Sequence, residues 1–145
     1  MKVVIQRVKN AKVRVGGSDV ARIERGFLLL VGVGKDDGSE DIEHLAKKVA
    51  NLRIFEDEKG KMNLDITQAH GSILSVPQFS LYADNRKGNR PGFDFSAEPG
   101  RAKEYREKFN CLLREGGVEV KEGVFGAHME VELTNDGPVT ILLES

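Results

Sequence analysis

The chain has 145 residues, of which 39% are hydrophobic and 31% are charged, a balance that suits one compact domain spanning residues 1–145. Its 22 Lys and Arg residues nearly balance its 23 Asp and Glu residues, so the net charge of −1 excludes a general attraction to polyanions. Any nucleic-acid contact must therefore come from a local basic patch. The single cysteine, Cys111, excludes an internal disulfide, and Met1–Val8 lacks a signal-peptide pattern. We predict a cytoplasmic protein.

Arg7 is the unusual residue of the first predicted strand, Val3–Val8. It falls on the same face as Val3 and Ile5, which alternation assigns to the core. Such an arginine either extends to solvent at the strand end or is held inside by carbonyl and carboxylate oxygens. The first arrangement is the commoner one.

Apolar patterning predicts the remaining regular elements. Strands are predicted at Ala11–Val15, Val20–Ile23, Phe27–Val31, Arg53–Phe55 and Val118–Val120, with an extended segment at Met62–Thr67. Helical spacing predicts one helix over Ser39–Leu52, capped by Ser39, and another over Pro99–Glu115, which ends before Gly116. The predicted fold class is α/β: a strongly curved or barrel-like mixed sheet flanked by these two helices.

Ser72–Tyr82 predicts a further strand that contains Pro77. Proline cannot donate to a sheet ladder, so the strand should be an edge or bulged strand at that point. Backbone groups left unpaired there could bind a ligand, which makes Gln78, Phe79 and Ser80 candidate site residues. The alternative is a plain edge strand that the proline protects from aggregation.

The long connection Asp84–Gly100 carries Arg86, Lys87 and Arg90 among glycines. Long loops in compact domains are commonly functional, and cations on such a loop suit phosphate contacts. A solvated run of charges is the commoner explanation.

Asn135–Thr140 is the second stretch of interest. It separates two predicted strands, Ala127–Leu133 and Val139–Leu143, and Asn-Asp-Gly-Pro is an ordinary hairpin signal. The alternative hypothesis starts from Gly137 and Pro138, because a Gly-Pro pair, which can adopt a cis peptide bond, can hold two carbonyl groups fixed with no glycine side chain in the way. Such a unit could inspect the stereocentre of a ligand.

The usual catalytic patterns are missing. The three histidines have no partner at metal-ligand spacing, and no nucleophile elbow, P-loop or dinucleotide motif occurs. We therefore predict no metal and no cofactor. Ser80 is the remaining candidate nucleophile, without an evident histidine to activate it. Catalysis would then depend on positioning and on fixed backbone N–H donors.

The two stretches together resemble the signature pair of the D-aminoacyl-tRNA deacylases, usually written SQFTL and NxGPVT. Here they read Val76-Pro77-Gln78-Phe79-Ser80-Leu81 and Asn135-Asp136-Gly137-Pro138-Val139-Thr140. The likeness extends over the whole chain, including Ile5–Val8, Gly60–Leu64 and Phe125–Met129.

The resemblance implies a homodimer in which Gly137 and Pro138, with the proline cis, enter the neighbouring subunit's pocket and exclude L-aminoacyl esters. D-aminoacyl and glycyl esters would be accepted. It also implies that Arg7 holds the Gly-Pro segment in place.

The same resemblance implies roles at the reacting end of the tRNA. Backbone groups of Phe79 and Ser80 would polarise the ester carbonyl, Gln78 would orient the substrate, and Phe125 and Met129 would line the pocket. The 2′-hydroxyl of the terminal adenosine would assist attack by water. We assign Arg86, Lys87 and Arg90 to tRNA phosphates from the loop composition alone.

Two residues depart from the family pattern, since Ser80 replaces threonine and Pro77 replaces serine. A Pro-Gln start is similar to a related animal branch that tolerates L-alanyl esters, whereas the intact Gly-Pro-Val-Thr favours the main branch. Two further alternatives are a non-catalytic tRNA-binding module and a small-molecule esterase that acts through Ser80.

Overall fold

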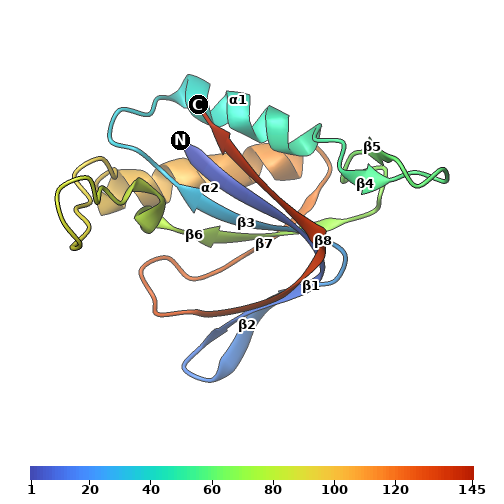
Figure 1. Ribbon diagram of the computed structural model, residues 1–145, viewed down its shortest axis with the longest axis horizontal. Coiled ribbons are helices and arrows are strands. Elements are labelled where there is room, and N and C mark those ends of the chain that lie inside the picture. Colours follow the sequence, from blue (N-terminus) through green and yellow to red (C-terminus); the bar gives the residue numbers. More distant parts are fainter.

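A strongly curved mixed β-sheet, with two helices packed against one face, forms the computed structural model, which describes residues 1–145 (Figure 1). The sheet order is β2-β1-β3-β6-β7, with β8 paired to the free side of β1. The sheet strands are β1 (Lys2–Val15), β2 (Ser18–Ile23), β3 (Gly26–Gly32), β6 (Ser72–Pro77), β7 (Glu119–Glu122) and β8 (Glu130–Glu144). The helices are α1 (Ser39–Ala50) and α2 (Pro99–Glu115). The short strands β4 (Phe55–Glu56) and β5 (Met62–Leu64) pair with each other in a separate two-stranded antiparallel sheet. The predicted α/β architecture is confirmed.

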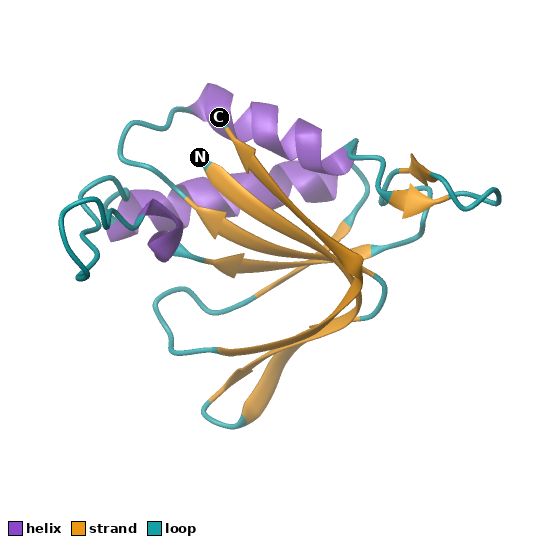
Figure 2. Ribbon diagram, in the orientation of Figure 1, coloured by secondary structure: helices purple, strands orange, loops and turns teal.

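The curvature of the sheet originates in β1, which changes its partner along its length. Its first half pairs antiparallel with β3, its second half pairs antiparallel with β2, and β8 follows it throughout. β3, β6 and β7 then run parallel to one another. The sheet therefore folds back beneath itself at the bend of β1 and β8, while both helices stay on the other side (Figure 2).

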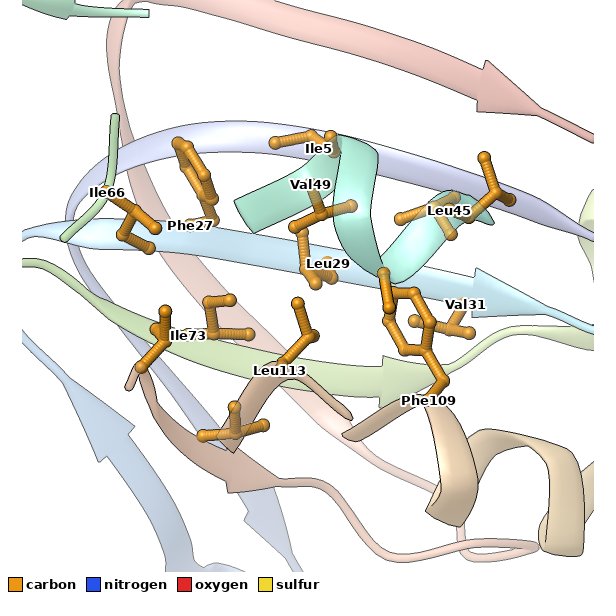
Figure 3. Close-up of a cluster of buried hydrophobic side chains, with 14 of the residues drawn as sticks. Ile5, Phe27, Leu29, Val31, Leu45, Val49, Ile66, Ile73, Phe109 and Leu113 are labelled. Carbon is orange, nitrogen blue, oxygen red and sulfur yellow. The ribbon is translucent and has the colours of Figure 1, made fainter. Parts of the chain in front are cut away.

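Two apolar clusters fill the two faces of the sheet. The larger one lies between the sheet and the helices, where Phe27, Leu29 and Ile73 meet Val49 and Leu113 (Figure 3). The smaller one fills the inside of the curve, with Val13, Leu28 and Leu74 among its members. β3 contributes to both clusters, which explains why its sequence is apolar without alternation.

Several predicted boundaries are confirmed and others move. The Pro99–Glu115 helix is found as predicted, with the proline in its first turn. The first helix ends at Ala50 rather than Leu52, and its N-cap is Gly38 rather than Ser39. The Gly38 N–H donates to Asp41 Oδ2 at 2.7 Å, so a side chain inside the first turn does the capping.

The predicted Ser72–Tyr82 strand is wrong beyond Pro77. The chain there turns into a 3₁₀ helix, η1 (Phe79–Tyr82). Pro77 itself lies at a local edge, because β7 pairs only with Ser72–Ser75. The prediction of an edge at the proline is therefore confirmed, although the continuation of the strand is not.

The predicted hairpin at Asn135 is also wrong. β8 runs without a turn from Glu130 to Glu144 and stays paired with β1. Gln6 lies opposite Thr140 and Val8 lies opposite Asn135, so residues 136–139 bulge out opposite Arg7 alone. Because β1 offers a partner along its whole length, the chain accommodates the extra residues as a bulge rather than reversing.

No helix in the structure combines the length and apolar character needed to cross a lipid bilayer.

Replacement of Gly26 by alanine should severely destabilise the fold. A Cβ at Gly26 would lie 1.7 Å from the carbonyl oxygen of Ser72, where β3 and β6 pair at close range. We expect Gly26→Ala to lower the free energy of unfolding by more than about 3 kcal/mol in urea titrations.

Gly100→Ala is the matched control, since a Cβ there meets nothing within 4 Å and the site is in the first turn of α2. We expect that variant to be neutral or more stable by up to about 1 kcal/mol. Equal stability of the two variants would contradict the close packing of β3 on β6.

Candidate active site

A cleft of about 700 Å³ opens where β6 ends. Its walls come from the end of β6, the start of η1, the first half of α2 and the segment that leads into β8. Predicted site residues Gln78, Phe79, Phe125 and Met129 all line it. Segments distant in sequence thus converge at one end of the parallel strands, the usual position of ligand sites in α/β sheets.

Gln78 marks the transition from β6 into η1. Its backbone N–H donates to the Val31 carbonyl at 2.9 Å, which fixes the start of the turn. The first N–H groups of a helical turn have no acceptor inside it, and no side chain caps η1. The amides of Phe79 and Ser80 are therefore without an acceptor inside the turn, and Phe79, which lines the cleft, is the one placed to bind an oxyanion there.

The Ser80 hydroxyl accepts a hydrogen bond from the Gln78 side-chain amide. Ser80 does not line the cleft, whereas the exposed His128 does. No hydrogen bond joins the two side chains, so the pair lacks the nucleophile–base contact of a hydrolytic serine.

Aromatic side chains form the outer rim of the cleft. Phe79 is 59% exposed and packs edge-on against Phe93, with ring centroids 4.8 Å apart. Exposure of such a large apolar surface is costly in water, which makes this rim a candidate contact surface for a ligand or partner.

Arg7 is held inside, contrary to the commoner expectation. The side chain is 5% exposed, its Nε donates to the Asp136 carbonyl at 2.9 Å, and its Nη1 donates to the Ile54 carbonyl at 2.6 Å. Carbonyl oxygens thus satisfy the buried guanidinium, and Arg7 contacts the residue that precedes Gly137.

Asn135 braces the other side of the same bulge. Its Oδ1 accepts from the Val139 N–H at 2.7 Å, and its Nδ2 donates to Thr140 Oγ1 at 3.1 Å. Between these anchors the Gly137–Pro138 peptide bond is cis, and both residues are exposed. Neither residue lines the cleft of its own chain. Within this chain, Gly137 and Pro138 therefore lie on a different surface from the cleft that Gln78 and Phe79 line.

The three cations of the predicted loop, Arg86, Lys87 and Arg90, lie outside the cleft, although other residues of the loop, Phe93 and 96–99, line it. Arg86 forms a two-pronged contact with Asp84, at 2.8 Å from Nε and 2.7 Å from Nη2. These hydrogen bonds lower the pKa of Asp84 to about 2. Lys87 and Arg90 are exposed and form no salt bridge, so they are the unpaired cations of this loop.

Sequence patterning missed one charged residue of the cleft, Arg106. It lies on the buried face of α2 with Phe109, Asn110 and Leu113, and it lines the cleft. Its position, four residues after Ala102 and three before Phe109, places it within the apolar stripe. A charged residue within the apolar stripe of a helix is unusual, and this was the feature of the sequence that could have identified Arg106.

Residues 4–144 match the family described as D-Tyr-tRNA(Tyr) deacylase. The D-aminoacyl-tRNA deacylase of Thermosipho africanus is 56% identical over 145 residues, which is 100% of this chain and 97% of that protein. The D-aminoacyl-tRNA deacylase of Staphylococcus haemolyticus is 58% identical over 100% of this chain and 96% of its own length.

Two solved structures share the fold of this chain. The c-Myc DNA Unwinding Element Binding Protein is 41% identical, with a TM-score of 0.94 over 100% of this chain and 99% of that one. A probable eukaryotic D-amino acid tRNA deacylase shares the fold at 19% identity, with a TM-score of 0.85 over 99% of this chain and 98% of that one. The resemblance predicted from the two signature stretches is confirmed, and the chain belongs to the D-Tyr-tRNA(Tyr) deacylase family.

Proposed function

We propose that the protein hydrolyses the ester bond of D-aminoacyl-tRNA in the cytoplasm and releases the D-amino acid and free tRNA. The observation that carries the proposal is the cleft at the end of β6. It brings Gln78 and Phe79 together with Phe125 and Met129, in a chain 56–58% identical to proteins named D-aminoacyl-tRNA deacylase. Glycyl-tRNA, which has no side chain to reject, is a second substrate of the same site.

Selection of the D-amino acid requires a second copy of the chain. Gly137 and Pro138 are exposed and rigidly anchored through Arg7 and Asn135, yet they do not line the cleft of their own protomer. In a homodimer they enter the partner's cleft, where their carbonyl groups occupy the space that an L side chain needs. The discrimination is steric exclusion, which a small set of fixed atoms can supply.

Hydrolysis proceeds by attack of water on the ester carbonyl carbon. The amides of Phe79 and Ser80 stabilise the negative charge that develops on the carbonyl oxygen. The 2′-hydroxyl of the terminal adenosine assists the water, and the bond to the 3′-oxygen of the ribose breaks as that oxygen takes up a proton. This assignment accounts for a cleft with no serine–histidine pair.

The cations of the Asp84–Gly100 loop bind the tRNA away from the ester that is hydrolysed. Lys87 and Arg90 contact tRNA phosphates, and Arg86 joins them when its pair with Asp84 opens. These contacts contribute affinity that falls with salt, rather than specificity for the amino acid.

A single set of assays tests this function. We expect hydrolysis of D-aminoacyl-tRNA at least about 100-fold faster than that of the L-aminoacyl ester, and no hydrolysis of an activated ester without a nucleotide. Ser80→Ala should retain turnover within about tenfold, because its hydroxyl is not the nucleophile.

Other outcomes of these assays would contradict the proposal in distinguishable ways. Salt-dependent tRNA binding without ester cleavage would indicate a binding module. Cleavage of L-alanyl-tRNA would indicate the branch with relaxed selectivity. An acyl-serine trapped on Ser80 would indicate a serine esterase.

Replacement of Gly137 by alanine should weaken chiral selection. Its φ is +148°, and a Cβ would lie 2.7 Å from Val139 Cγ2 and 2.8 Å from the Val139 nitrogen, so the bulge must shift. We expect the ratio of kcat/KM for D- over L-aminoacyl-tRNA to fall about 100-fold.

Cys111→Ser serves as the control, since Cys111 is exposed on α2 and does not line the cleft. That variant should keep the wild-type ratio. An unchanged ratio in Gly137→Ala would remove Gly137 from the selection mechanism.

A further inference from the structure

Three of the seven phenylalanines are exposed to solvent, and all three lie between residues 79 and 95. Phe79, Phe93 and Phe95 expose 59%, 36% and 42% of their surface. Large apolar rings that gather at one place on a surface indicate a contact with a ligand or partner. Phe79 and Phe93 belong to the rim of the cleft, whereas Phe95 lies outside it.

The backbone holds Phe95 directly beside the wall of the cleft. Its carbonyl oxygen accepts from the Lys35 N–H at 3.0 Å, and Ser96 forms a β-bridge with Gly34. Ser96 lines the cleft, whereas Phe95 lines a separate, smaller hollow of about 270 Å³. Neighbouring Cα atoms are about 3.8 Å apart, so a single nucleotide is long enough to pass from the cleft wall to Phe95.

Two cations flank the Phe95 ring. The Lys35 Nζ atom lies 4.9 Å and the Arg86 Cζ atom 5.7 Å from the centroid of the ring. Arg86 is paired with Asp84, but Lys35 is exposed and forms no salt bridge, so its ammonium group is free to move. At exposed sites a cation–π contact is weaker than the stacking of a base on an aromatic ring. A base can therefore displace the ammonium group from the ring.

The ligand chemistry follows from the ring and from the weak net charge around it. Asp36 and Asp94, the chain neighbours of Lys35 and Phe95, are exposed as well, so this surface is not uniformly basic. A duplex, which presents mainly phosphates, would gain little here. An unpaired nucleotide fits better, because its base stacks on the ring and its single phosphate needs one cation.

We propose that Phe95 stacks against one of the two unpaired nucleotides that precede the terminal adenosine of tRNA, and that Lys35 turns from the ring to the adjoining phosphate. This inference rests on the proposed function, in which the aminoacylated end of the RNA occupies the neighbouring cleft. Phe95 is a substrate-binding residue outside the cleft, and it favours the end of an RNA chain over a single nucleoside.

Two small substrates that differ only in these nucleotides test the proposal. They are 3′-O-(D-tyrosyl)-adenosine and the trinucleotide CpCpA that carries D-tyrosine on the same 3′-oxygen. We expect the wild-type protein to favour the trinucleotide by at least about tenfold in kcat/KM, the usual effect of one stacked base. In Phe95→Ala most of this preference should disappear, whereas kcat/KM for the adenosine ester should stay within about threefold of wild type. Phe95→Trp should keep the preference, because it retains an aromatic face.

Val20→Ala is the matched control. Val20 is 45% exposed on β2 and lines neither hollow, so loss of its side chain should leave the trinucleotide preference intact. Equal losses of kcat/KM on both substrates in Phe95→Ala would show a purely structural role and would overturn the proposal. An unchanged preference in Phe95→Ala would overturn it too. If sedimentation then showed a shift from dimer to monomer, the Phe95 surface would be assigned to a second protein chain instead.

Binding measurements separate this inference from the proposed function. Titration calorimetry with unacylated CpCpA and with adenosine needs no turnover. Tighter binding of CpCpA that is lost in Phe95→Ala supports the inference even if the protein cleaves no ester. Equal binding of the two compounds by the wild-type protein contradicts it even if D-aminoacyl-tRNA is cleaved.

Discussion

The structure depends on the way Arg7 occupies the space between two backbone carbonyls. The guanidinium joins Ile54, which follows α1, to Asp136 in the bulge of β8. A charge buried to this degree is tolerated because carbonyl oxygens accept from it, and removal of either acceptor would leave donors unsatisfied. The same contact fixes where the chain leaves the regular ladder and presents Gly137 and Pro138 to solvent. The buried Arg7 side chain therefore contributes both to the packing of the interior and to the exposed position of Gly137 and Pro138.

The β1–β8 ladder supplies the rest of the geometry. Because β8 is paired on both sides of the bulge, the exposed Gly-Pro unit is held at two ends rather than carried on a free loop. The cleft is built differently, from the end of a parallel strand, a 3₁₀ turn and one face of α2. Rigid elements thus carry both the Gly137–Pro138 bulge and the cleft. Such rigidity suits a site that must exclude the L enantiomer of an amino acid.

The sequence predicted the elements with strong periodicity and failed where tertiary contacts decide. Pro99–Glu115 carries an apolar stripe and an N-terminal proline, so its bounds could be read directly. The Asn135 segment looks like a hairpin locally, and only the presence of β1 as a continuous partner makes it a bulge. The family followed from two motifs in the right order. Arg106 was missed because a single charged residue within the apolar stripe of a helix does not change the predicted helix. In the fold it is buried and lines the cleft.

We propose that the Gly-Pro unit of one protomer completes the cleft of the other, and mixed dimers test this arrangement most directly. One chain carries Gly137→Ala with an intact cleft, and the other carries a cleft blocked by Met129→Trp with an intact bulge. Neither homodimer should cleave D-aminoacyl-tRNA with normal selectivity. After co-refolding, we expect the mixed dimer to regain one wild-type site, measured as strict D-selective hydrolysis. A mixture no more active or selective than the average of the two homodimers would contradict it.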